Sequence, residues 1–198
     1  GALKSGAFPV ELNGKEYGLL FSLNALDEVQ EKFGGYDKLS EVFNKDNPNL
    51  FKIKGLLTLL INEALLAEDE NAQLLEEKVG RLIHAGNLQE VQNAIFKSFY
   101  RGTAGDNSDT ENENDGEETT EEETGQRAGK LDTARLLYIA VVLLRYRERE
   151  AWRKTPYQIT TLFKYHKEYN PHIFRQEQAG TPAATENMDD IDIALGGF

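Results

Sequence analysis

The sequence predicts a mainly α-helical protein with a small N-terminal β-hairpin followed by a helical bundle, an acidic disordered linker and a C-terminal helical pair. Apolar and polar residues alternate only near the N-terminus, and elsewhere apolar residues recur at three- and four-residue spacing. A block of acidic and small polar residues interrupts the helical pattern. The predicted divisions are the hairpin and helical domain (1–102), the linker (103–130), the C-terminal helices (131–170) and a flexible tail (171–198).

The hairpin is predicted from two alternating runs separated by Asn13-Gly14. This pair suits a tight turn because both of its residues tolerate positive φ. The apolar members of the runs are Phe8, Val10 and Leu12 before the turn and Tyr17, Leu19 and Phe21 after it. A two-stranded hairpin is marginal by itself, so its apolar face is expected to lie on the following helices or on a second copy of the protein.

The chain then changes to a helical period. Ser22 is a candidate N-cap for the first helix, and Gly34-Gly35 is expected to end that helix. The pattern indicates four further helices: a short one behind Asp37, an apolar core helix over 50–66, one over 71–86, and one from Asn87 to Gly102.

The acidic linker accounts for most of the net charge of −12. Ten carboxylates and no basic residue occur between Asp106 and Glu123, which leaves 24 acidic and 22 basic residues in the rest of the 198-residue chain. Residues 103–129 also lack any large apolar side chain. Self-repulsion and the absence of core-forming residues favour a solvated tether over a rigid DNA mimic or a mask for a basic partner.

Two helices are predicted after the linker. Asp132 is a candidate N-cap for the first, whose run of nine apolar residues, 136–144, is about half the length that a bilayer requires. It is therefore interpreted as a buried helix of a soluble, cytoplasmic protein. Thr155-Pro156-Tyr157-Gln158 places Thr at the N-cap, Pro at the first helical position and Gln at the third, and Asn170-Pro171 is expected to close this helix.

No pattern of catalytic or metal-binding residues emerges, so we expect no enzymatic activity, cofactor or metal. The chain has no cysteine, which excludes disulfides and thiolate chemistry. His84, His166 and His172 lack the spacing of metal ligands, and the acids at 189–192 lack the spacing of a calcium loop. The tail ends in apolar residues that could form a short docking motif: Ile191, Ile193, Leu195 and Phe198.

One basic segment, from Arg145 to Lys154, is a candidate for nucleic-acid binding. It contains Arg145, Arg147, Arg149, Arg153 and Lys154, with Tyr146 and Trp152 between them. Clustered cations and accessible aromatic rings suit a nucleic acid. Two glutamates interrupt the run, however, and cations near the end of a helix are expected on structural grounds. A small helical nucleic-acid-binding regulator is therefore the alternative hypothesis.

Two segments resemble a known family. Phe8-Pro9-Val10-Glu11-Leu12-Asn13-Gly14-Lys15-Glu16-Tyr17, followed by Leu19-Leu20-Phe21-Ser22-Leu23-Asn24-Ala25-Leu26 and Glu31-Lys32-Phe33-Gly34, resembles the opening of phage tail assembly chaperones from siphophages and prophages of Gram-positive bacteria. Those proteins typically begin with a "G-K-E-Y" hairpin that leads into a helix. Trp152-Arg153-Lys154-Thr155-Pro156-Tyr157-Gln158-Ile159 is similar to a "W-x-x-T-P-x-x-[IL]" element further along tail assembly proteins.

The resemblance implies a non-enzymatic viral protein of the host cell cytoplasm. Such chaperones coat the long helical tape measure protein and help to recruit tail tube subunits around it. A homo-oligomer is expected, with the hairpin edge as a contact because an unpaired strand edge invites pairing. No membrane partner is expected, and nucleic acid is the less favoured partner. The candidate partner-binding residues are Tyr17, Leu19, Phe21, Phe96, Phe99, Trp152 and Tyr157.

Overall fold

The computed structural model describes residues 6–35, 38–69, 71–105 and 131–174. These residues form a mainly helical structure that begins with a two-stranded antiparallel hairpin, which confirms the predicted fold class. Within this part of the chain we distinguish an N-lobe (6–105) and a C-lobe (131–174). The predicted disordered linker, from residue 106 on, and the tail from residue 175 on lie outside the described residues, as does the candidate docking motif.

The hairpin consists of β1 (Phe8–Leu12) and β2 (Lys15–Leu19), paired in the register Val10 to Tyr17. Asn13 and Gly14 have φ values of 52° and 76°, as the predicted turn requires. Val10, Leu12 and Leu19 are buried, with β1 against α5 and β2 against α3. The helices therefore cover the apolar face of the hairpin within a single chain.

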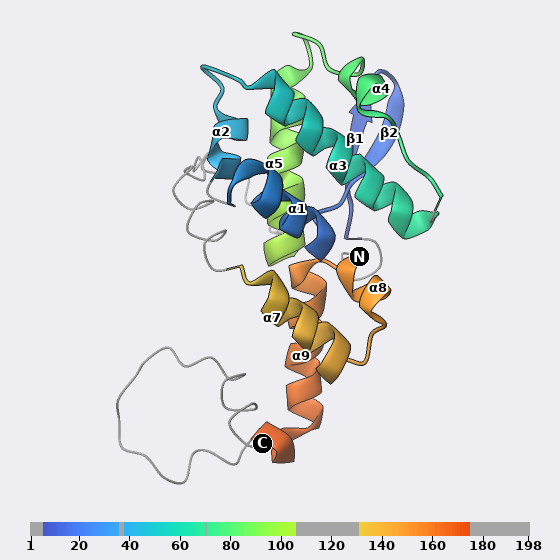
Figure 1. The fold of residues 1–198 in the computed structure, drawn as a ribbon, viewed down its shortest axis with the longest axis vertical. Helices are drawn as coiled ribbons and strands as arrows, with labels where there is room; N and C mark the ends of the chain where they lie inside the picture. The colour runs from blue at the N-terminus through green and yellow to red at the C-terminus, as the bar shows by residue number, and fades with distance from the viewer. Residues whose placement is uncertain (1–5, 36–37, 70, 106–130, 175–198) are drawn as a thin grey trace, which may run out of the picture.

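The N-lobe helices are α1 (Leu23–Phe33), α2 (Leu39–Phe43), α3 (Leu50–Glu68), α4 (Glu76–Gly80) and α5 (Leu88–Ala104) (Figure 1). Helix α3 contributes most to the core of this lobe, and its fully buried apolar residues are Ile53, Leu56, Leu57, Leu60 and Ile61. The predicted ends of α1 are confirmed. The Ser22 hydroxyl accepts a hydrogen bond from the Ala25 N–H at 3.1 Å, and Gly34 closes the helix at a φ of 81°.

The prediction of one helix over 71–86 is wrong at both ends. Only the middle of this segment is helical, as α4, and residues 71–75 and 81–86 are not in a helix. The side-chain amide of Asn62 on α3 explains the first difference. Asn62 accepts a hydrogen bond from the Leu74 N–H at 2.7 Å and donates one to the Leu74 carbonyl at 3.0 Å. Because both backbone polar groups of Leu74 bond to α3, this residue is not available for an early helical turn.

Helix α5 continues past Gly102, where the sequence predicted its end. Gly102 is buried inside the helix, and a side chain there would come within 3.1 Å of Phe21 Cβ and 3.2 Å of the Phe21 carbonyl. The glycine is therefore required for close packing rather than for termination. The helix ends instead at Gly105, whose φ is 82°.

The C-lobe contains α7 (Thr133–Tyr138), the π-helix η3 (Ile139–Leu143), α8 (Glu148–Trp152), α9 (Pro156–Tyr169) and α10 (Pro171–Phe174). The expected caps are confirmed: Asp132 accepts a hydrogen bond from the Arg135 N–H, and Thr155 and Gln158 form a capping box. The lobe is more than the predicted helical pair, because the charged segment after η3 forms α8. Pro171 begins α10 instead of a tail, as suits proline in a first helical turn.

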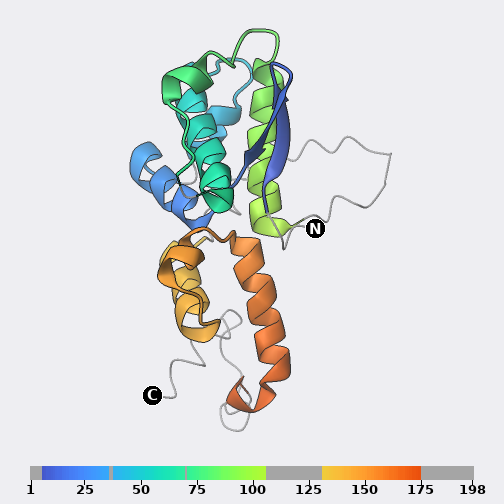
Figure 2. The same ribbon diagram turned by 90° about the vertical axis from the view of Figure 1, so that its right-hand side faces the viewer.

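The two lobes pack together through α1. The side chain of Leu23 in α1 lies in the C-lobe core, with Leu136, Ile139, Ala140, Ala151, Ile159 and Phe163. Helix α9 also contacts α5, and α7 contacts α1. In Figure 2 the C-lobe helices extend from the end of the N-lobe where α1 begins and α5 ends. No helix among the described residues is long and apolar enough to cross a membrane.

Candidate protein-binding site at the start of helix α3

Apolar side chains are exposed at the first turn of α3, next to a cavity. Leu50 is 57% exposed and Phe51 is 76% exposed. The cavity has a volume of about 260 Å³ and an almost entirely apolar wall. We call it the α3 pocket, and its lining residues are Leu50, Lys54, Gly80, Ile83, His84, Ala85 and Leu88. Exposed apolar groups around an apolar cavity are typical of a protein-binding surface.

Two asparagines shape the walls of the pocket. Asn49 caps α3 by accepting a hydrogen bond from the Lys52 N–H at 3.1 Å, which places Leu50 in the first, solvent-facing turn. On the opposite wall, the buried Asn87 accepts from the His84 N–H at 2.8 Å and donates to the Leu82 carbonyl at 2.7 Å. These two bonds hold the connection between α4 and α5 in shape, and that connection supplies Ile83, His84 and Ala85 to the pocket.

A close contact brings α4 against α3 beneath the pocket. A side chain at Gly80 would come within 2.8 Å of Cδ in the flexible Lys54 side chain, which shows how closely the two helices approach. The Lys54 ammonium lies 3.2 Å from a Glu76 carboxylate oxygen and 5.6 Å from the centre of the Phe51 ring. The cation on the rim is thus paired within the protein. The site consequently offers a partner apolar contact more than net charge.

Three of the predicted partner-binding residues are core residues, and we withdraw them as contacts. Leu19 and Phe21 are fully buried, and Phe99 is 1% exposed. The rings of Phe21 and Phe99 meet edge to face with their centres 5.4 Å apart. They hold the hairpin exit against α5, so their side chains present no surface to a partner in this fold.

The other four predicted residues are partly buried and do not form one surface. Tyr17 packs against the N-lobe core, and Phe96 packs against Phe43 with ring centres 5.4 Å apart. Trp152 lies in the C-lobe with its indole N–H 3.4 Å from a Glu148 carboxylate oxygen. Tyr157 packs against Gly105 at the end of α5. The structure thus distributes these side chains over both lobes.

Sequence reasoning missed Leu50 and Phe51, although a signal for them was present. The segment 50–66 has apolar residues on most faces of a helix, more than one buried face requires. The apolar side chains beyond one buried face had to be covered by other elements or remain exposed. In the structure α3 is covered along most of its length, and the surplus is exposed at its first turn.

The basic segment is exposed but mixed in charge. Arg145, Arg147 and Arg149 lie on the surface together with Glu148 and Glu150. The Lys154 ammonium lies over one face of the Tyr146 ring, 5.3 Å from its centre. It therefore occupies a face of the ring on which a nucleobase could otherwise stack. This segment therefore has cations for phosphate contacts but a poor stacking platform.

Comparisons of the chain with protein family models, curated proteins and solved structures found no match. Among the described residues, no group of three or more histidines and acids is arranged to hold a metal ion.

Proposed function

We propose that this protein is a non-enzymatic phage tail assembly chaperone that binds apolar helical segments of the tape measure protein at the α3 pocket. It then helps to recruit tail tube subunits in the cytoplasm of the bacterial host. The observation that carries the binding site is the exposure of Leu50 and Phe51 beside an apolar cavity of about 260 Å³. The partner class comes from the resemblance of the hairpin and first helix to such chaperones.

The geometry suits an amphipathic helix. One large apolar side chain of the partner enters the cavity, and a neighbouring one, a helical turn away, covers the ring of Phe51. Complete burial of a residue such as Phe51 stabilises a complex by about 1.5–3 kcal/mol, so one such contact is weak. Many copies bound along the same tape measure protein gain affinity through proximity.

Co-expression with the tape measure protein of the same phage tests this proposal. Phe51→Ser should leave the fold intact, because 76% of this residue is already exposed, and should abolish co-purification of the partner. Tyr169→Ser is the matched control, since Tyr169 is 82% exposed and lies on α9 of the other lobe. If the Phe51 variant still keeps the tape measure protein soluble and bound, the site is elsewhere.

We also propose that the protein forms a homo-oligomer through the hairpin. The hairpin has only two strands, and the side chains of Glu11, Lys15 and Glu16 are exposed on it. Pro9 lacks a backbone N–H, which limits the register in which another strand can add to β1. Multi-angle light scattering of the free protein tests this, and a strictly monomeric mass over a range of concentrations contradicts it.

A nucleic-acid-binding regulator is the second candidate, favoured by the charge of the C-lobe. Residues 131–174 contain eight Lys and Arg residues against four Asp and Glu residues. Gel shifts over a salt series separate the candidates, because phosphate contacts weaken steeply as salt rises. Binding of DNA or RNA that is lost in an Arg147→Ser and Arg149→Ser variant would favour the regulator over the chaperone.

A further inference from the structure

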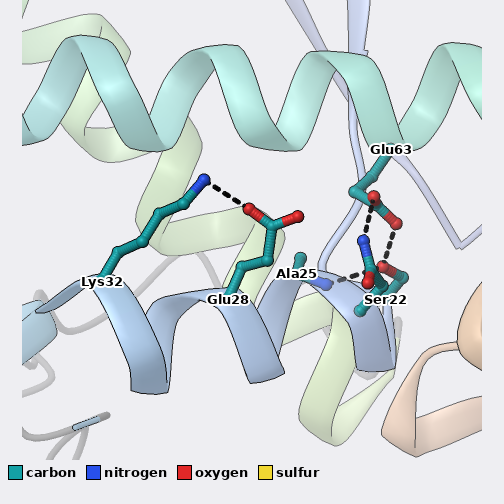
Figure 3. A network of polar contacts seen from close by, with 6 residues as sticks. Ser22, Ala25, Glu28, Lys32 and Glu63 are labelled. Carbon is teal, nitrogen blue, oxygen red and sulfur yellow. Dashed lines mark hydrogen bonds and ion pairs between the residues drawn. The ribbon is translucent and has the colours of Figure 1, made fainter. Parts of the chain in front are cut away.

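Three consecutive residues at the start of α1 link this helix to α3 and to the C-lobe. The side chains of Ser22 and Asn24 both donate hydrogen bonds to the carboxylate of Glu63 on α3, the second at 2.7 Å. Between them, Leu23 donates its backbone N–H to the Lys154 carbonyl of the C-lobe at 2.9 Å and places its side chain in the C-lobe core. In Figure 3 the carboxylate of Glu63 points from α3 toward the first turn of α1.

Glu63 is a buried acid within this junction. It is 5% exposed, and its hydrogen-bond donors are the neutral Ser22 hydroxyl and Asn24 amide. Two charged groups act on it from neighbouring elements, with opposite effects: Glu28 of α1 and Arg153, which follows α8. Glu28 is itself paired with Lys32 at 2.5 Å.

Part of the boundary between the C-lobe and α3 is not filled by side chains. A cavity of about 260 Å³ lies between the last turns of α3 and the connection from α8 to α9. Its lining includes Ala64 and Ala67 on α3 and Arg153 and Lys154 in the connection. The cavity borders Ala64, the residue after Glu63, so water would reach Glu63 if the connection moved away from α1 and gave up the contacts of Leu23.

We propose that the docking of the C-lobe onto α1 is coupled to the charge of Glu63, so that a neutral carboxyl favours the docked arrangement and ionisation favours its opening. The docked lobe withholds water from the carboxylate, and two neutral donors compensate only part of that loss. Opening of the connection returns water to the ionised group. The neutral group gains much less from this hydration.

The direction of the pH dependence follows from burial. Desolvation raises the pKa of Glu63, although the hydrogen bonds from Ser22 and Asn24 and the charge of Arg153 act against this rise. In the opened arrangement the carboxylate is hydrated and its pKa returns toward the ordinary range. Docking therefore strengthens as the pH falls through the raised pKa and weakens as the pH rises through it. By the same linkage, a partner that separates the lobes makes Glu63 more acidic.

Amide hydrogen exchange of Leu23 in the full chain tests the coupling, because this N–H is bonded to the C-lobe. After correction for intrinsic exchange, its protection should fall with rising pH by up to about tenfold per unit within the window between the two pKa values. Glu63→Gln should remove this pH dependence, since a glutamine cannot ionise. Glu31→Gln is the control: it removes an exposed carboxylate from α1, away from the cavity, and should behave as the wild type.

A second measurement does not depend on a variant. The side-chain carboxyl carbon of Glu63, followed by NMR in the wild-type chain, should titrate over the same pH range in which the protection of Leu23 changes. If the two curves do not coincide, or if the Glu63→Gln variant retains the wild-type pH dependence, the coupling does not exist.

Discussion

The ring of Tyr157 on α9 lies over the α-carbon of Gly105, the residue that ends α5. A side chain at position 105 would come within 2.3 Å of Tyr157 Cζ. Gly105 also has a φ of 82°, which side chains seldom adopt. Both the backbone conformation and the contact between the lobes therefore require glycine at this position.

Gly105→Ala should lower the free energy of unfolding by about 2–4 kcal/mol, because positive φ and overpacking each cost 1 kcal/mol or more. Gly55→Ala is the matched control. Gly55 lies inside α3 with no atom near the space that a side chain would occupy, so alanine there should stabilise the protein by about 0.5–1 kcal/mol. Urea titrations of the two variants measure the difference, and equal effects would contradict this account.

Leu23→Ala should weaken the C-lobe more than the N-lobe, although Leu23 belongs to an N-lobe helix. Removing a buried leucine side chain costs about 2–5 kcal/mol. Trp152, the only tryptophan, reports on the C-lobe, so its fluorescence should change at lower urea concentration than the helical circular dichroism signal of the whole chain. Leu26→Ala is the control, because it removes a side chain from the N-lobe core. In this variant the tryptophan fluorescence should not change at a lower urea concentration than the circular dichroism signal.

Glu63→Gln should change how the global stability depends on pH. Because burial raises the pKa of Glu63 in the folded state, its favourable contribution is present below the unfolded-state pKa and is lost as the pH rises through the folded-state value. The wild type should therefore lose stability relative to the variant over this window. Chemical denaturation on both sides of the window measures this loss, and a constant difference between the two proteins would exclude it.

Thr155→Ala should lower the free energy of unfolding by about 0.5–2 kcal/mol, because the Thr155 hydroxyl caps α9 by accepting a hydrogen bond from the Gln158 N–H. Thr160→Ala, at an exposed position within the same helix, is the control and should have little effect. Thermal unfolding of both variants measures the two changes. A larger loss for the Thr160 variant would show that the cap is not important for α9.

Local signals made much of the fold predictable. Asn13-Gly14, Ser22 and Thr155 act through hydrogen bonds and φ values within a few residues, so their effects can be inferred from neighbouring positions alone. The bond network between Asn62 and Leu74 could not be inferred in this way. It joins residues 12 positions apart, and an asparagine in a helix gives no indication of which backbone groups it will bind.

The candidate site was less predictable than the fold, for a physical reason. Large apolar residues are used both for cores and for binding surfaces, and the pattern does not separate the two uses. Phe21 and Phe99 were expected at a surface and are buried, whereas Phe51 was assigned to a core helix and is exposed. Only the three-dimensional arrangement of α3, α4 and α5 decides which side chains are covered.

The place of Leu23 in the C-lobe core has a consequence for biosynthesis. Leu23 leaves the ribosome long before its core partners between Leu136 and Phe163, so the core that they share cannot close until most of the chain has been made. Contacts between residues so far apart in the chain form late, since a large loop must be closed first. During translation Leu23 is therefore an apolar group without its final partners, and the first turn of α1 is a point at which the nascent N-lobe is open to association with other chains.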